Sequence, residues 1–205
     1  MSEFTMILTE QDDRVLTITL NRPDDLNPLS WQVLNEIDSV LDRALRDDSV
    51  GVIVIGAAGK AFSTGYDLRE AHWITSQYPA NFDDHVDIRK DRDDVHLIVD
   101  YWMKLWRYPK PLIAKVQGDC LSGAGELLGV CDLAIVSEHA RFGHPAGRDL
   151  GIPPSIMFWP MLIGYRKTKE LLYTSRLIPA HEAQQIGLVN EVVPHDQLDE
   201  RVAKT

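Results

Sequence analysis

Two glycine-containing segments of this 205-residue chain carry the residue types best suited to chemistry. They read AFSTGYDL at residues 61–68 and GDCLSGAGEL at residues 118–127, and each follows a short β-branched apolar run, 52–55 and 112–116. Such runs are typical of buried strands in an α/β sheet, and glycine loops at the ends of these strands let a ligand approach the backbone closely. The pattern predicts two backbone N–H donors that converge on one oxygen.

The residues after Gly123 add an acid and a helix to this site. The run AGELLGV at 124–130 predicts a helix whose N-terminus contributes a partial positive charge, so an oxyanion would be stabilised there. Glu126 lies on the first turn of that helix and would act as a general acid or base. The alternative for Glu126 is an acid that the helix dipole merely favours at this position.

The remaining pattern predicts the elements that position these loops. Residues 6–9 and 15–20 form a hairpin, and Ser30 is the N-cap of a helix with apolar residues at 34, 37, 41, 44 and 45. The strand at 52–55 then completes a β-α-β crossover. Further along, we expect a helix over 95–106, a strand at 133–136, and helices at 167–174 and 180–186. Gly187 is expected to cap the C-terminus of the last helix. Residues 69–94 are predicted to form a flap over the site.

Together these segments resemble the crotonase superfamily, the enoyl-CoA hydratase/isomerase family. The other matching segments are LNRP at 20–23, LNPLS at 26–30, CDLA at 131–134, ARFG at 140–143 and AHEA to IGLVNEVVP at 180–194. The resemblance implies an α/β fold, a crotonase-like spiral of ββα repeats with mostly parallel sheets. It also implies a core domain over 1–194, with 195–205 as the start of a C-terminal helical segment for trimerisation that is truncated here. The expected assembly is a homotrimer or a dimer of trimers.

The resemblance assigns roles within the two loops. The N–H groups of Tyr66 and Gly123 would bind the carbonyl oxygen of an acyl-CoA thioester and stabilise an enolate. Glu126 matches one of the two catalytic glutamates of enoyl-CoA hydratases. The second would fall near Ala146 or Gly147, which cannot transfer a proton.

Three side chains near the vacant position are candidates to replace the second acid. Asp149 would reach it if the loop is one residue longer than in the hydratases. His144 fits a hydrogen-bonded loop residue better than a catalytic one, and Arg148 fits a partner of Asp149.

Coenzyme A would lie against the first loop and the segment at 26–27. The expected contacts are Leu26, Ala61, Ser63, Asp67 and Leu68. Asp25 stands where the family often has a basic residue, so Arg22, Lys60, Arg69 or a residue outside this sequence must balance the phosphates. A set of aromatic residues would shape an acyl pocket or, more commonly, belong to the core or to oligomer contacts: Trp73, Tyr78, Phe82, Tyr101, Trp102, Trp106, Phe158 and Trp159.

Composition excludes several other classes. The formal net charge of −10 argues against nucleic-acid binding, and no apolar run approaches the roughly 20 residues of a membrane span. The two cysteines and the absence of a signal-like N-terminus lead us to expect a cytoplasmic protein. No Walker A motif, no GxGxxG after a strand and no zinc-type Cys/His spacing are present, so no metal and no cofactor beyond the coenzyme A of the substrate are expected.

The resemblance favours enoyl-CoA hydratase first. A double-bond isomerase that uses Glu126 alone stays open, because one carboxylate can shuttle a proton, whereas hydration ordinarily needs activated water as well. A crotonase-like acyl-CoA hydrolase or decarboxylase and a non-catalytic acyl-CoA-binding relative are further alternatives.

Overall fold

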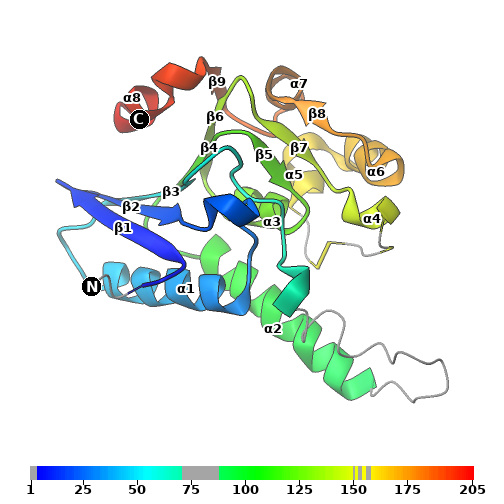
Figure 1. Cartoon of the computed structure of the whole chain (residues 1–205), viewed down its shortest axis with the longest axis horizontal. Helices are drawn as coiled ribbons and strands as arrows, with labels where there is room; N and C mark the ends of the chain where they lie inside the picture. Colours follow the sequence, from blue (N-terminus) through cyan, green and yellow to red (C-terminus); the bar gives the residue numbers. More distant parts are fainter. Residues whose placement is uncertain (1–3, 71–87, 150, 152–153, 156–157) are drawn as a thin grey trace.

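The structure, a computed structural model, describes residues 4–70, 88–149, 151, 154–155 and 158–205 (Figure 1). Residues 71–87, the larger part of the expected flap, lie outside the described residues, and so do Trp73, Tyr78 and Phe82. In the described part of the chain, no helix has both the length and the apolar character that crossing a bilayer requires.

The main sheet has six strands in the order β1-β2-β3-β4-β6-β9. Their bounds are β1 Ile7–Asp12, β2 Val15–Leu20, β3 Val52–Ala57, β4 Leu112–Val116, β6 Leu133–Ser137 and β9 Glu191–Val193. The first two strands form the predicted antiparallel hairpin, and all other neighbours in this sheet are parallel. The expected mostly parallel α/β architecture is confirmed.

A second, three-stranded sheet contains β5 Asp119–Leu121, β7 Arg141–Gly143 and β8 Ile178–Pro179. Strands of two or three residues are too short for a hydropathy period, and the sequence pattern places residues 118–122 in a loop instead. Strand β5 thus falls inside the second glycine segment. Strand β5 follows β4 and precedes a helix, and β7 follows β6 in the same way, so the chain repeats a ββα unit as the resemblance implies.

The helices agree with the predictions in type more closely than in extent. They are α1 Trp31–Leu45, α2 Ile88–Trp106, α3 Gly123–Val130, α4 Ala146–Asp149, α5 Trp159–Ile163, α6 Tyr165–Thr174, α7 Ala180–Gln185 and α8 Leu198–Ala203. Ser30 caps α1 as expected, because its side chain accepts a hydrogen bond from the Val33 N–H at 3.2 Å. Helix α2 begins at Ile88 rather than Val95, since its first two turns are charged and show no apolar period.

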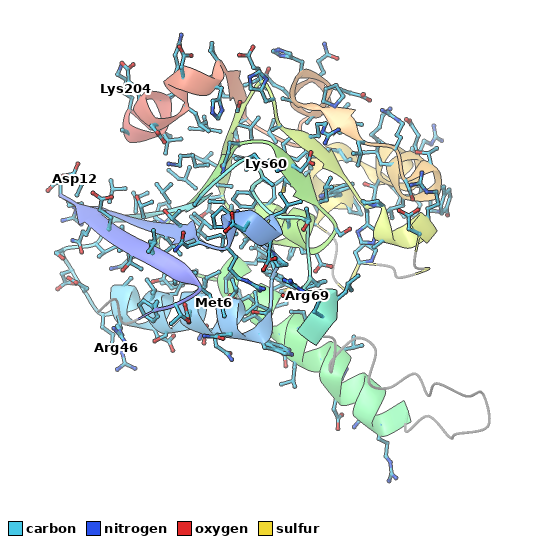
Figure 2. The ribbon with its side chains drawn as sticks, viewed as in Figure 1. Met6, Asp12, Arg46, Lys60, Arg69 and Lys204 are labelled. Atoms are coloured by element: carbon cyan, nitrogen blue, oxygen red, sulfur yellow. The ribbon has the colours of Figure 1, made fainter. Side chains whose placement is uncertain are left out.

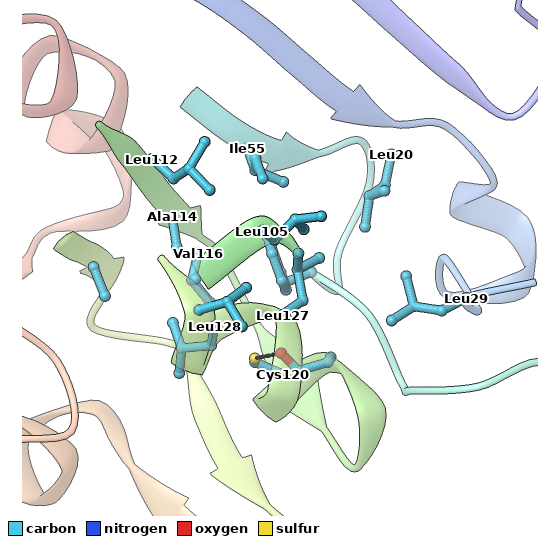
Figure 3. Packing of buried hydrophobic residues seen from close by; sticks show 14 of the residues in the cluster. Leu20, Leu29, Ile55, Leu105, Leu112, Ala114, Val116, Cys120, Leu127 and Leu128 are labelled. Carbon is cyan, nitrogen blue, oxygen red and sulfur yellow. Dashed lines mark hydrogen bonds between the residues drawn. The ribbon is translucent and has the colours of Figure 1, made fainter. Parts of the chain in front are cut away.

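The core lies on both faces of the main sheet. Ile53 and Ile55 of β3 join the larger apolar cluster with α1, α2 and α3, whereas Val54 faces the other way and packs with Leu198 and Val202 of α8. Figure 3 shows the larger cluster, with Ala114 and Val116 of β4 close to the leucines of α3. Helix α3, which carries Glu126, follows β5 directly in the chain and contacts both β5 and α2.

Candidate active site

The two glycine segments lie side by side. Ser63 pairs with Cys120 of β5 in a parallel bridge, and the Leu121 N–H donates to the Ser63 carbonyl at 3.0 Å. Gly65 has a φ of +100°, and a Cβ at this position would lie 2.9 Å from the Gly123 nitrogen. The structure thus brings together the two loops that the sequence predicted to converge.

Gly123 is the first residue of α3, so its N–H has no acceptor within the helix. Among the hydrogen bonds between described residues, none uses the Gly123 N–H as a donor. This amide and the positive end of an eight-residue helix therefore lie next to Gly65 and Tyr66.

Tyr66 is held at both ends of its peptide. The Leu29 N–H donates to the Gly65 carbonyl at 2.8 Å, and the Asp67 N–H donates to the Leu29 carbonyl at 2.9 Å. The ring lies on Gly123, where a Cβ would be 2.8 Å from two ring carbons. The side chain is consequently part of the site and does not point to solvent.

Glu126 is buried, with 3% of its surface exposed, in a cluster of polar side chains. The Tyr66 hydroxyl donates to Glu126 Oε2, and the Ser155 hydroxyl lies 3.0 Å from both carboxylate oxygens. The Trp102 Nε1–H of α2 donates to the Tyr66 hydroxyl oxygen at 2.9 Å. Burial and the adjacent Glu126 carboxylate raise the pKa of the Tyr66 phenol well above its ordinary value, so this hydroxyl keeps its proton.

Ser155 and the hydrogen bond of Trp102 were not predicted from the sequence. Ser155 stands 29 residues from Glu126 in a loop without hydropathy pattern, and no local signal could have found it. Trp102 was included only among candidate pocket aromatics, and the structure places it in the core with no exposed surface. Phe158 and Trp159 are buried as well, whereas Trp106 is 49% exposed.

The region of the missing second acid holds no carboxylate that contacts Glu126 among the described interactions. Asp149 lies on α4, is exposed and pairs with Arg148 at 2.7 Å, as was predicted for that arginine. The hydrogen bond from Arg148 lowers the pKa of Asp149, which favours a charged surface carboxylate. His144 is buried, and its carbonyl accepts a hydrogen bond from the Gly147 N–H.

The residues expected to contact coenzyme A differ in exposure. Leu26 adopts a left-handed conformation with φ of +64°, and its carbonyl accepts a hydrogen bond from the Thr64 N–H. The Asn27 amide donates to the Ala58 and Ala61 carbonyls at 2.8 and 2.9 Å, which ties the Leu26 segment to Ala61. Ser63 is fully buried and its hydroxyl accepts from the Gly65 N–H. Leu68 is 49% exposed.

Four charged side chains at and near the first loop form a compact network. Arg22 pairs with Asp67 at 2.8 Å and with Asp25 at 3.0 Å, and Arg69 pairs with both aspartates. Burial acts to raise the pKa of Asp67, but hydrogen bonds from Arg69 and Arg22 outweigh it and lower that pKa to about 2. Both arginines that were expected to balance phosphates are therefore already paired with carboxylates.

Lys60 lies apart from this network. It is exposed on the loop after β3, and Figure 2 labels it together with Arg69. The ion pairs between described residues do not include Lys60.

The described residues contain no cluster of three His, Cys, Asp or Glu side chains that could hold a metal ion. Burial raises the pKa of the Cys120 thiol, so Cys120 is not an activated nucleophile.

Comparisons with known proteins show the family to which the chain belongs. A sequence profile described as enoyl-CoA hydratase/isomerase matches residues 10–205. A probable enoyl-CoA hydratase of Mycobacterium bovis is 36% identical over 200 residues, which are 95% of this chain and 71% of the relative. The hydroxycinnamoyl-CoA hydratase-lyase of Pseudomonas fluorescens is 32% identical and is covered over 68% of its length, with 95% of this chain matched.

A solved structure shows the same fold. The crystal structure of an enoyl-CoA hydratase/isomerase from Xanthobacter autotrophicus Py2 superposes with a TM-score of 0.87 at 35% identity, over 98% of this chain and 71% of that one. The chain belongs to the enoyl-CoA hydratase/isomerase family, and it is an enzyme of the crotonase fold.

Proposed function

We propose that the chain is an enoyl-CoA hydratase that acts on acyl-CoA thioesters through an enolate. The observation that carries the proposal is the buried carboxylate of Glu126 on the first turn of α3, next to the point where the Gly65 and Gly123 loops touch. A proton-transferring group and a site for an oxyanion then lie in one place.

The two loops supply the electrostatic part of the reaction. The N–H groups of Tyr66 and Gly123 donate to the thioester carbonyl oxygen, which becomes negatively charged when a bond forms at the β-carbon. Loss of one such donor typically costs about 3 kcal/mol of transition-state stabilisation, a rate factor of roughly a hundred. Coenzyme A enters as part of the substrate, held against Leu26, Ala61, Ser63, Asp67 and Leu68, and no separate cofactor takes part.

Glu126 carries the proton chemistry. In hydration, the oxygen of water bonds to the β-carbon as the electrons of the double bond move onto the thioester oxygen, and Glu126 takes a proton from that water. The enolate then takes this proton from Glu126 at its α-carbon, so that one water is added overall. Asp149 is the sequence's candidate for the second acid, but its ion pair with Arg148 at the surface does not favour this role.

A double-bond isomerase is the second candidate, because Glu126 is the one carboxylate in contact with the Tyr66 and Ser155 cluster among the described residues. In that reaction Glu126 removes a proton from one carbon of the acyl chain and returns it to another, with no net addition.

Mass spectrometry tests the proposal on a panel of short, long and aromatic enoyl-CoA thioesters incubated with the purified protein. Gain of one water supports the hydratase. An unchanged mass with a displaced double bond, detected by separating the products, supports the isomerase. Binding of the thioesters without any turnover would overturn the enzymatic proposal in favour of an acyl-CoA-binding role.

We also propose that the protein forms trimers or dimers of trimers, with residues 195–205 at the start of the segment that supports this assembly. Light scattering that shows a stable monomer at micromolar concentration would contradict this.

A further inference from the structure

The side chain of Tyr66 links parts of the site that lie far apart in the sequence. Its hydroxyl accepts a hydrogen bond from Trp102 of α2 and donates one to Glu126 of α3, while Ser155 contacts both the hydroxyl and the carboxylate. The backbone of the same residue lies in the first glycine loop, which is fixed to Leu29. One residue thus joins the oxyanion loop to the acid.

The directions of these hydrogen bonds follow from the number of protons. An indole Nε1–H can only donate, so the Tyr66 oxygen accepts from Trp102 at 2.9 Å. An ionised carboxylate can only accept, so the single proton of Tyr66 and the single proton of Ser155 both point to Glu126. The two hydroxyl oxygens lie 3.2 Å apart.

The network leaves the Tyr66 ring little freedom. The ring lies against Gly123 on one side, and Trp102 is a fully buried part of the core. Hydrogen bonds at Gly65 and Asp67 fix the peptide on each side of Tyr66. A hydroxyl held in this way can keep Glu126 in one orientation at no further entropic cost.

We propose that the Tyr66 hydroxyl is a positioning group that, together with Ser155, holds the Glu126 carboxylate in one orientation for proton transfer. This inference rests on the proposed function for its kinetic part, since it assigns Tyr66 a task in the same reaction. The backbone N–H of Tyr66 and its hydroxyl then serve the same enzyme in two separate ways.

The variant Tyr66→Phe tests the kinetic part, because it keeps the ring on Gly123 and removes only the hydroxyl. Hydrogen bonds to charged groups are the strong ones, so we expect kcat to fall roughly tenfold to a hundredfold. The KM and the affinity for the non-reactive thioester butyryl-CoA, measured by calorimetry, should stay within about twofold, since the oxyanion amide is retained. The matched control is Tyr108→Phe, whose hydroxyl donates to the Leu41 carbonyl at 2.7 Å, and its kcat should equal that of the wild type.

A second readout needs no substrate. The indole N–H resonance of Trp102, assigned by its loss in Trp102→Phe, should move upfield in Tyr66→Phe because its acceptor is gone, and it should stay in place in Tyr108→Phe. An unmoved Trp102 resonance, or a kcat of Tyr66→Phe within twofold of the wild type, overturns the inference. If the wild type turns over no thioester, the proposed function fails and the Trp102 resonance alone decides whether the network exists.

The variant Ser155→Ala keeps the proposal testable if Tyr66→Phe does not fold. It removes the other donor to Glu126 from a half-buried loop position, and we expect a smaller fall in kcat with unchanged butyryl-CoA affinity. Two results together would overturn the proposal. One is full activity of Ser155→Ala, and the other is an unmoved Trp102 resonance in a folded Tyr66 variant.

Discussion

The ring of Tyr66 lies directly on the α-carbon of Gly123, so close that a Cβ at Gly123 would be 2.8 Å from Cδ2 and Cε2 of the ring. Real Cβ atoms do not approach other carbons this closely, and glycine is therefore required at position 123 as long as Tyr66 is present. The two residues whose amides are assigned to the oxyanion are thus also in steric contact.

Gly123→Ala should inactivate the enzyme by displacing that ring. The ring cannot retreat without breaking its hydrogen bonds to Trp102 and Glu126, so both the donors and the acid are misplaced. A displacement of this kind costs roughly a hundredfold in kcat/KM. Steady-state kinetics of the purified variant measures the loss, and thermal unfolding checks that the variant is folded.

A double-mutant cycle shows whether the ring is the cause. In a Tyr66→Ala background the clash is absent, so adding Gly123→Ala should change kcat/KM by less than about threefold. If Gly123→Ala lowered kcat/KM equally in the wild type and in Tyr66→Ala, the contact between Gly123 and the Tyr66 ring would not be the cause of the loss.

Gly65→Ala should destabilise the fold more than a comparable glycine substitution. Gly65 has a φ of +100° and a Cβ there would lie 2.9 Å from the Gly123 nitrogen and the Leu121 carbonyl oxygen. Gly164 has a φ of +78° with nothing within 4 Å of its Cβ position, so Gly164→Ala reports the cost of the backbone conformation alone. We expect the free energy of unfolding of Gly65→Ala to be lower by roughly 2 kcal/mol or more beyond that control. Equal urea midpoints for the two variants would refute the close packing of the loops.

The sequence predicted the fold best where a long hydropathy pattern and a local signal agree. The β2-α1-β3 unit is an example, because Ser30 caps a helix with a clear apolar face and both strands are β-branched. The start of α2 was misplaced, since charge conceals its first turns, and β5 was missed, since three residues carry no period.

The candidate site was predicted in part for a similar physical reason. Glycine loops and Glu126 carry local signals, so their proximity could be inferred from strand ends. Ser155 and Trp102 reach Glu126 and Tyr66 only through tertiary packing, across 29 and 36 residues of sequence, and no local pattern encodes such a contact. The neutralisation of Arg22 and Arg69 by Asp25 and Asp67 likewise becomes visible only in three dimensions.

Asp67 should contribute to stability in a pH-dependent way. Its folded-state pKa of about 2 lies below the ordinary unfolded value, so the contribution is complete above about pH 4 and is lost as the pH falls through 2. A shift of this size corresponds to about 2 kcal/mol, part of which solvent screening at the exposed Arg69 removes.

Chemical unfolding of the wild type and Asp67→Asn over pH 2–7 measures this contribution. The difference in unfolding free energy should be largest at neutral pH and shrink towards pH 2. A difference that does not change with pH would show that the carboxylate charge of Asp67 is not the stabilising feature.

Proton transfer by Glu126 is most directly tested by the turnover of a short-chain enoyl-CoA by the wild type and by Glu126→Gln. The amide keeps the shape of the carboxylate and can still accept hydrogen bonds from Tyr66 and Ser155, but it cannot exchange a proton. General acid–base catalysis contributes roughly a hundredfold to ten-thousandfold, so we expect kcat of Glu126→Gln to fall within that range while butyryl-CoA affinity stays within a few fold. Turnover by Glu126→Gln within threefold of the wild type would contradict the account.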